Sequence, residues 1–173
     1  MSLFDARPSS IAARALCGLA LALLTAGCGF HLRGDVSYAF SSAYVNSPVP
    51  SPLVTELKRT LEGGGTTIVE KPTDAQVTLD ISNIADGKDV LSLSGGGRVR
   101  EYALSKRVIV AVHDAEGRDW MPAAEIVVRR SYSFNESEVL AREAQEAKLY
   151  REMQTDAVQQ IMRRLQTAKK PNA

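Results

Sequence analysis

The sequence predicts an α+β domain in which two helices pack on one face of a mixed, mostly antiparallel sheet of about four to five strands. An early segment and the last segment of the chain carry apolar residues at helical spacing. The region between them shows the alternation of apolar and polar residues that is typical of strands. Because each helix needs an apolar partner, a sheet covered on one face is the most economical packing.

Local signals predict the first strand and the first helix. The apolar segment at residues 43–45 predicts a short strand. Ser51 is placed to cap a helix whose first turn accepts Pro52, because a missing N–H has no consequence there. Four apolar residues follow at helical spacing: Leu53, Val54, Leu57 and Leu61. Three glycines from Gly63 end this helix, and the β-branched residues at 66–69 predict a second short strand.

Two further strands are predicted in the middle of the chain. Val77, Leu79 and Ile81 alternate with polar residues, which predicts a strand with one wet face. Asp86-Gly87 predicts a turn after that strand. Beyond the glycines at 95–97, a long strand keeps one parity in five apolar residues: Tyr102, Leu104, Val108, Val110 and Val112.

A hairpin and a final helix complete the domain. Residues 114–117 predict the hairpin turn, and a return strand follows over about residues 124–134. Arg130 interrupts the apolar phase of this strand, which indicates either a bulge or an arginine beyond the covered part of the sheet. Residues 137–167 contain neither proline nor glycine and predict one long amphipathic helix. Its apolar stripe consists of Tyr150, Met153, Ala157, Val158, Ile161, Met162 and Leu165.

Composition excludes several classes of protein. The chain has 173 residues, of which 45% are hydrophobic, with 21 basic and 20 acidic residues. This apolar content and the small net charge exclude disorder for most of the chain, and the length excludes a large multidomain enzyme. The balanced charge also argues against nucleic acid as the partner, because that function needs a basic excess on one face.

The beginning of the sequence has the layout of a secretory signal, with Arg7 and Arg14 before an apolar run at residues 15–24. That run is roughly half of the ~20 residues that a membrane-spanning helix needs. The string Leu24-Thr25-Ala26-Gly27-Cys28 resembles the lipobox of bacterial lipoproteins. The resemblance implies cleavage before Cys28 and acylation of that cysteine.

These segments give the predicted division of the chain. Residues 1–27 are a lipoprotein signal peptide, and residues 28–42 are a lipidated N-terminal segment. Residues 43–167 form a single α+β domain, and residues 168–173 form a flexible C-terminal tail.

The sequence offers no arrangement for catalysis or for a metal. The chain has two histidines, His31 and His113, and the lipobox assigns Cys28 to acylation, so no zinc cluster is predicted. The glycine runs at 63–65 and 95–97 lack the features of a phosphate loop, and no order of serine, histidine and aspartate suggests a triad. We therefore predict no enzyme activity, no catalytic residue, no metal and no cofactor.

A local basic cluster surrounds the second glycine run. Its members are Arg98, Arg100, Lys106 and Arg107, together with Arg129 and Arg130 on the strand expected to pair nearby. Two interpretations of this cluster remain open. Guanidinium groups beside apolar surface suit an amphiphile that carries phosphates. A charged edge that discourages strand addition has the same composition.

Several strings resemble the LptE family of lipoproteins. They are Cys28-Gly29-Phe30-His31-Leu32-Arg33 after the lipobox, Glu101-Tyr102 at a strand start, and Arg151-Glu152-Met153 with Gln159-Gln160-Ile161-Met162-Arg163-Arg164-Leu165 on the last helix. The resemblance implies a lipid-anchored outer-membrane protein that faces the periplasm, plugs the lumen of the LptD β-barrel and assists its assembly. It implies binding of lipopolysaccharide during export to the cell surface. The implied partners are LptD in a heterodimer, lipopolysaccharide, and outer-membrane lipid through acylated Cys28.

The resemblance also implies which residues contact lipopolysaccharide. Basic residues with this role in the family fall near the loop before Glu101-Tyr102 and near the start of the last helix. The matching candidates here are Arg98, Arg100 and Arg142. The alternative function is that of an auxiliary lipoprotein in an envelope lipid-transport ABC system, whereas a tethered periplasmic hydrolase lacks a nucleophile site.

Overall fold

The structure is a computed structural model that describes residues 38–133 and 139–171, with the backbone alone for residues 139–142. Two compact units divide the chain, Met1–Gly34 and Asp35–Ala173, and the second contains every described residue. Its elements are β1 (Ser42–Asn46), α2 (Pro52–Gly63), β2 (Thr67–Ile68), the 3-10 helix η1 (Pro72–Asp74), β3 (Val77–Leu93), β4 (Val99–His113), β5 (Asp119–Ser133) and α3 (Val139–Leu165). The predicted signal peptide and Cys28 lie outside the described residues, so both assignments stay predictions.

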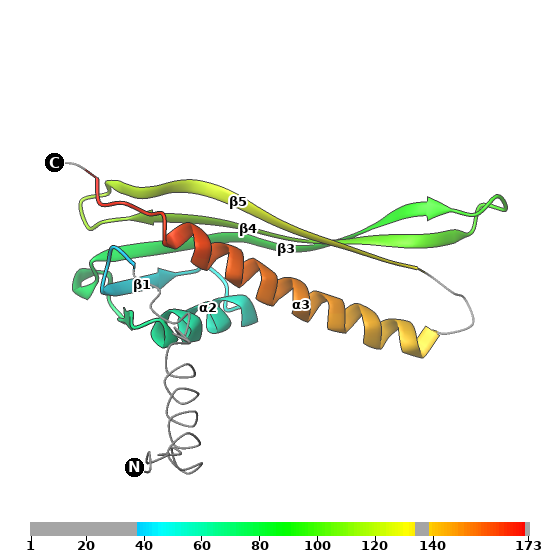
Figure 1. The fold of residues 1–173 in the computed structure, drawn as a ribbon, viewed down its shortest axis with the longest axis horizontal. Helices are drawn as coiled ribbons and strands as arrows, with labels where there is room; N and C mark the ends of the chain where they lie inside the picture. Colours follow the sequence, from blue (N-terminus) through cyan, green and yellow to red (C-terminus); the bar gives the residue numbers. More distant parts are fainter. Residues whose placement is uncertain (1–37, 134–138, 172–173) are drawn as a thin grey trace, which may run out of the picture. The chain divides into compact units, whose positions relative to one another are not determined.

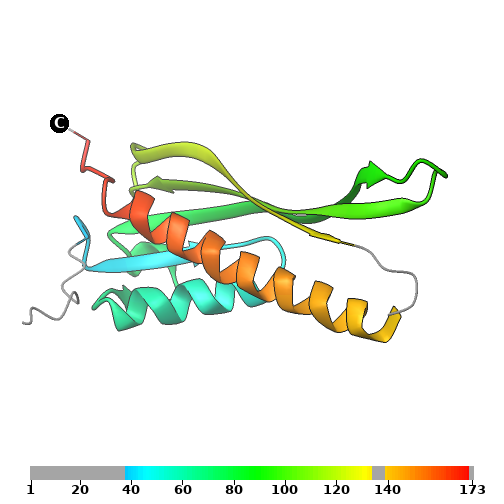
Figure 2. The same ribbon diagram turned by 45° about the vertical axis from the view of Figure 1, so that its right-hand side comes forward.

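The five strands form one mixed sheet in the order β2-β1-β3-β4-β5. β1 runs parallel to β2 and β3, whereas β3, β4 and β5 pair antiparallel. Both helices lie on the same side of the sheet, and α3 packs along β5 and β4 and beside α2 (Figures 1 and 2). The predicted fold class and the predicted order of elements are confirmed.

Helix α2 begins and ends where its sequence signals place it. The hydroxyl of Ser51 accepts a hydrogen bond of 3.2 Å from the backbone N–H of Leu53. At the other end, the N–H of Gly64 donates to carbonyls of the last turn. Gly65 follows with a φ of +85°, a conformation that glycine adopts without strain. The predicted cap and the predicted glycine stop are confirmed.

The core lies between the helices and one half of the long strands. Leu79 pairs with Val112 and Ile81 with Val110, and all four are buried on the helix-covered face. The helices add one buried stripe each: Leu53, Val54, Leu57 and Leu61 from α2, and Met153, Ala157, Val158, Ile161, Met162 and Leu165 from α3. No side chain between residues 143 and 152 is fully buried. Fully buried apolar packing therefore lies along the second half of α3, whereas Leu149 and Tyr150 before it are only partly buried against the core.

The predicted turn at Asp86-Gly87 is wrong, because both residues lie within β3. The register shifts between Ser82 and Ala85, and β3 then continues in pairing with β4. Gly87 is required here for space, since a Cβ on it would lie 2.4 Å from the hydroxyl oxygen of Ser105 on the opposite strand. The continuous hydrogen-bond ladder of two long strands outweighs the local preference of Asp-Gly for a turn.

Arg130 lies in the apolar phase of β5 without a bulge. It pairs with Leu104 in a register that is unbroken from Glu101 to Val110 of β4. Its guanidinium forms an ion pair with Asp156 of α3, and the side chain stays partly exposed. Of the two predicted alternatives the bulge is excluded, and the arginine occupies the margin of the helix-covered area.

The chain after α3 returns to the sheet. Ala168 is buried, and the backbone N–H of Lys169 donates a hydrogen bond of 3.2 Å to the carbonyl of Trp120 in β5. The first two residues of the segment that the sequence predicts to be a flexible tail are therefore held by the sheet.

The pair formed by Asp86 and Lys106 predicts unequal effects of two substitutions on stability. The ammonium of Lys106 is buried and lies 2.5 Å from the carboxylate of Asp86, which is half exposed. Asp86→Ala leaves a buried charge unpaired, so we expect a loss of about 1–3 kcal/mol in the free energy of unfolding. Lys106→Met leaves a carboxylate that water can solvate, so its loss should be smaller.

Urea unfolding followed by circular dichroism measures both variants. Asp89→Ala is the matched control, because Asp89 is an exposed carboxylate of the same strand, and we expect its effect to stay within about 0.5 kcal/mol. Equal losses for Asp86→Ala and Lys106→Met would contradict the prediction.

Candidate functional site

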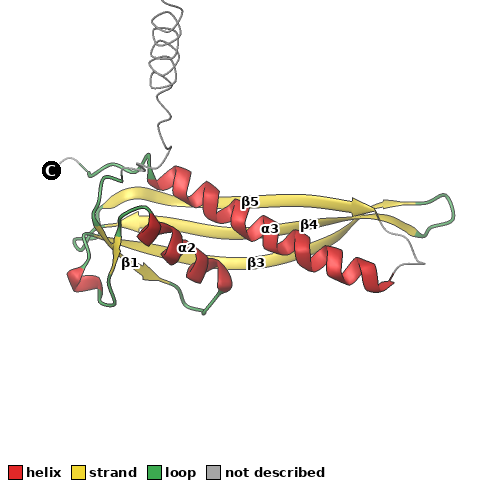
Figure 3. Ribbon diagram, turned by 60° about the horizontal axis from the view of Figure 1, so that its bottom comes forward, coloured by secondary structure: helices red, strands yellow, loops and turns green. Residues whose placement is uncertain are grey.

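The hairpin between β3 and β4 forms one end of the sheet. The N–H of Ser94 donates to the carbonyl of Arg98 over 2.7 Å, and the N–H of Gly97 donates to the carbonyl of Ser94 over 2.9 Å. Gly97 has a φ of +74°, so this turn requires a glycine at that position. The hairpin projects past the beginning of α3 (Figures 1 and 3). The residues of its turn thus lie beyond the cover of the helix.

Two of the three predicted lipopolysaccharide contacts lie in this hairpin. Arg98 ends the turn, Arg100 lies in β4, and both side chains are exposed. Arg100 lines a cavity of about 430 Å³ together with Ser92, Glu101 and Ser133. The hydroxyl of Ser92 donates a hydrogen bond of 2.9 Å to the carboxylate of Glu101. Arg100 therefore lies beside a polar cavity near the end of the sheet.

The third candidate, Arg142, lies in the first part of α3. Its side chain lies outside the described part of the chain, so its distance to the hairpin is not defined. Cys28, the predicted acylation site, also lies outside the described residues.

The basic cluster of the sequence divides over two faces of the sheet. Lys106 and Arg130 lie on the helix-covered face, where Asp86 and Asp156 neutralise them. Arg107 has the opposite parity in β4 and lies on the open face. Arg129 of β5 pairs with Ser105 of β4, which lies on the same open face. The two arginines of the hairpin, Arg98 and Arg100, are separated along β4 from the four basic residues nearer the middle of the strands.

A cluster of tyrosines and a lysine links the first half of α3 to the sheet, and the sequence did not predict it. The ammonium of Lys88 lies 2.5 Å from the carboxylate of Glu146 and 4.5 Å from the ring centre of Tyr102. The hydroxyl of Tyr132 donates a hydrogen bond of 2.8 Å to the same carboxylate, and the ring of Tyr132 stacks on that of Tyr102. The hydrogen bond to Glu146 raises the pKa of Lys88, which keeps this lysine charged. In the sequence, only the register of β3 against β4 could have indicated this cluster, and the predicted turn at Asp86-Gly87 hid that register.

A cavity of about 400 Å³ lies beside this cluster. Lys88 of β3 lines it together with four residues of α3: Glu143, Glu146, Ala147 and Tyr150. The hydroxyl of Tyr150 donates a hydrogen bond of 3.0 Å to the carbonyl of Gly87. Polar contacts therefore supplement the partly buried Leu149 and Tyr150 in holding the part of α3 before Met153 whose side chains the structure describes.

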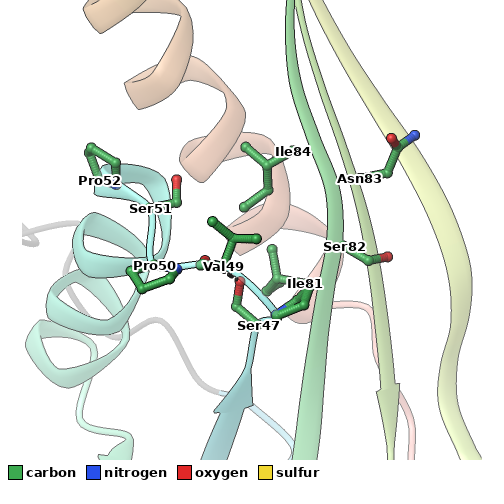
Figure 4. Close-up of a pocket in the computed structure, with 10 residues that line it drawn as sticks. Ser47, Val49, Pro50, Ser51, Pro52, Ile81, Ser82, Asn83 and Ile84 are labelled. Atoms are coloured by element: carbon green, nitrogen blue, oxygen red, sulfur yellow. Dashed lines mark hydrogen bonds between the residues drawn. The ribbon is translucent and has the colours of Figure 1, made fainter.

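Another cavity, of about 370 Å³, lies between the loop before α2 and the irregular part of β3. Figure 4 shows Val49, Ile81 and Ile84 directed into the space between the two segments, while Asn83 points away from it. This cavity is mainly apolar and contains no charged side chain.

His113 lies at the end of β4 with a hydrogen-bond acceptor at each ring nitrogen. Nδ1 lies 2.8 Å from the carbonyl of Asp114, and Nε2 lies 3.0 Å from the carboxylate of Asp80. The other carboxylate oxygen of Asp80 accepts a hydrogen bond of 2.7 Å from the side-chain amide of Asn46. This arrangement links β1, β3 and β4 on the open face, which is a structural role for the histidine.

Within the described residues, no three histidine, cysteine, aspartate or glutamate side chains lie together in a way that would hold a metal. In the same part of the chain, no helix combines the length and the hydropathy needed to cross a bilayer.

Solved structures place this fold in a class of small α+β lipoproteins. The solution NMR structure of an uncharacterized lipoprotein B from Nitrosomonas europaea has a TM-score of 0.69 and 34% identity, and the match covers 78% of this chain and 88% of that chain. The rare lipoprotein B from Shewanella oneidensis shares the fold with a TM-score of 0.64 at 24% identity, over 72% of this chain and 92% of that chain.

The family model for LptE, described as lipopolysaccharide-assembly, matches residues 36–165. The LPS-assembly lipoprotein LptE of Photorhabdus laumondii is 31% identical over 155 residues, which are 88% of this chain and 84% of that protein. The LptE of Yersinia enterocolitica is 33% identical over 154 residues, 87% of this chain and 73% of that protein. The chain therefore belongs to the LptE family of lipopolysaccharide-assembly lipoproteins, and as an assembly protein it is not an enzyme.

The contacts of His113 predict a pH dependence of stability. The hydrogen bond to the Asp114 carbonyl, followed by the contacts with Asp80, raises the pKa of His113 above its ordinary value of 6.5. A raised pKa in the folded state stabilises the fold fully below the unfolded-state pKa, and this stabilisation is lost as the pH rises through the folded-state pKa. We expect the urea midpoint to fall as the pH rises above the ordinary histidine value of 6.5, and to fall less in His113→Gln. Parallel pH profiles of the two proteins would contradict this expectation.

Proposed function

We propose that this protein is an outer-membrane lipoprotein that is anchored through acylated Cys28, occupies the lumen of the LptD β-barrel, assists assembly of that barrel and binds lipopolysaccharide. The observation that carries the proposal is the LptE family match over residues 36–165, which spans the whole of the folded unit up to the end of α3. The lipobox that ends at Cys28 supplies the anchor.

The proposed anchor fits the order of the segments. Cys28 precedes the first described residue, Tyr38, by a short segment, so an acylated cysteine would hold the folded unit close to the membrane surface. One acyl chain gives only marginal membrane binding, so a stable anchor needs several chains. No polybasic stretch is available in the sequence to supplement them.

The proposed position inside a barrel fits the charge of the protein. The lumen of a large outer-membrane barrel is polar, so a protein that fills it needs a surface of mixed charge. The 21 basic and 20 acidic residues of the chain balance. On the open face of the sheet, Arg107 and Arg129 lie on the same surface as Asp80 and His113. Such a surface suits contact with a polar wall.

The proposed lipopolysaccharide contacts are Arg98, Arg100 and Arg142. The fork of a guanidinium group matches the oxygens of a phosphate and is weakly hydrated. Arg98 and Arg100 are exposed at the end of the hairpin, where the turn at residues 94–97 fixes their position. Elsewhere in the cluster, Lys106 pairs with Asp86 and Arg130 pairs with Asp156.

Substitution of Cys28 tests the anchor and the partner together. We expect wild type to incorporate labelled fatty acid and to copurify with a heat-modifiable barrel, and we expect Cys28→Ser to lose the label because the acylated sulfur is absent. Label retained in Cys28→Ser would refute the anchor. Copurification of wild type with an inner-membrane transporter complex in place of the barrel would favour an auxiliary subunit of a lipid-transport system.

Charge reversal at the hairpin tests the ligand site. We expect Arg98→Glu/Arg100→Glu to weaken binding of purified lipopolysaccharide by about tenfold or more, since each charge-assisted hydrogen bond contributes about 1.5–3 kcal/mol. Arg142→Glu should weaken binding in the same direction. Equilibrium binding to immobilised lipopolysaccharide measures the effect.

The matched control is Arg107→Glu/Arg129→Glu, which makes the same change in net charge on the open face. We expect its affinity to stay close to that of wild type. Equal losses in the two double variants would show a response to overall charge and would reject the hairpin arginines as the site.

A further inference from the structure

The end of the β3–β4 hairpin is apolar as well as basic. In the described part of the chain, four large hydrophobic side chains are strongly exposed. Three of them lie close together in the sequence at the end of β3. Their exposed fractions are 51% for Val90, 55% for Leu91 and 56% for Leu93. The fourth, Val49 at 62%, lies in the loop before α2. We name Val90, Leu91 and Leu93 the apolar tip.

The apolar tip is exposed because β3 and β4 extend past the beginning of α3. Val90 pairs with Tyr102 and Leu93 pairs with Val99, so the ladder continues to the turn. The hairpin projects past the beginning of α3, which leaves these positions without a helix over them (Figure 3). Val90 shares the face of Tyr102, whereas Leu93 shares the opposite face with Val99, so the apolar side chains cover both faces of the hairpin end. Clustered exposed apolar side chains mark an interaction site more often than isolated ones do.

The neighbours of the apolar tip indicate the chemistry of its partner. Arg98 follows the turn and Arg100 is the second residue of β4, with the parity of Tyr102 and therefore on the face of Val90. Two cations thus lie on the same hairpin end as the three apolar side chains. A second copy of this chain would bring like charges together and is disfavoured. The polar wall of a pore offers no apolar surface to cover leucine side chains. A lipid with phosphates next to several acyl chains presents both complements, and its acyl chains can cover both faces of the hairpin end.

We propose that Val90, Leu91 and Leu93 contact the acyl chains of an anionic lipid whose phosphates are held by Arg98 and Arg100. This inference rests on the proposed lipopolysaccharide function and extends it, because it assigns the acyl region of the ligand to residues that no charge argument identifies. The hairpin end then binds the part of the lipid where the phosphates adjoin the acyl chains. Affinity depends on both halves of the ligand.

The test uses the full-length protein in detergent and two probes, purified lipopolysaccharide and the same lipopolysaccharide with its acyl chains removed by alkaline hydrolysis. We expect wild type to bind the acylated probe more tightly. We expect Leu91→Ser/Leu93→Ser to weaken binding of the acylated probe by about tenfold and to leave binding of the deacylated probe unchanged, because only apolar contact is removed.

The matched control is Val49→Ser, which removes an equally exposed apolar side chain from the loop before α2. It should bind both probes as wild type does. Unchanged circular dichroism and thermal midpoint in all variants establish that binding, and not folding, has changed.

The possible outcomes separate this inference from the proposed function. Wild-type affinity of Leu91→Ser/Leu93→Ser for the acylated probe, with a loss in Arg98→Glu/Arg100→Glu, would overturn the acyl contact and keep the arginine site. A loss of copurification with the barrel at unchanged lipid affinity would assign the apolar tip to a protein partner and would also overturn it. Absence of lipopolysaccharide binding in wild type would overturn the proposed ligand itself.

Discussion

The continuous pairing of β3 with β4 is the constraint on which the rest of the structure depends. Strands of 17 and 15 residues extend over roughly 50 Å, whereas the 12 residues of α2 cover about 18 Å. The helices therefore bury one half of the strand pair fully and leave the other half to polar contacts and solvent. A small register shift after Ser82 keeps the ladder going where the sequence favours a turn.

This mismatch in length divides the folded unit into two parts with different physical properties. One half has an apolar core between both helices and the sheet, and it supplies the stability. In the other half, Lys88, Tyr132 and Tyr150 tie α3 to the strands through hydrogen bonds and an ion pair that are partly exposed to water. Partly exposed polar contacts stabilise less than buried apolar ones, so the first half of α3 is held more weakly than the second.

Membership of the LptE family gives this arrangement a context. The family match extends through all strands and α3, including the hairpin between β3 and β4. The residues that the resemblance assigned to lipopolysaccharide fall in that accessible half, with Arg98 and Arg100 at the turn and Arg142 in the first part of α3. The structure brings Arg98 and Arg100 to one end of the sheet, while the place of the Arg142 side chain stays a prediction.

Local patterns in the sequence determined the elements, and only the tertiary structure decided how distant segments meet. Ser51, the glycines after α2 and the parity of Val108, Val110 and Val112 specify a helix and a strand through contacts within a few residues, so the sequence alone predicts them. The continuation of β3 through Asp86, the pairing of Arg130 with Asp156 and the stacking of Tyr102 on Tyr132 depend on the register between strands and on the path of α3. A shift of one residue would send each of these side chains to the other face, and no local signal fixes that choice.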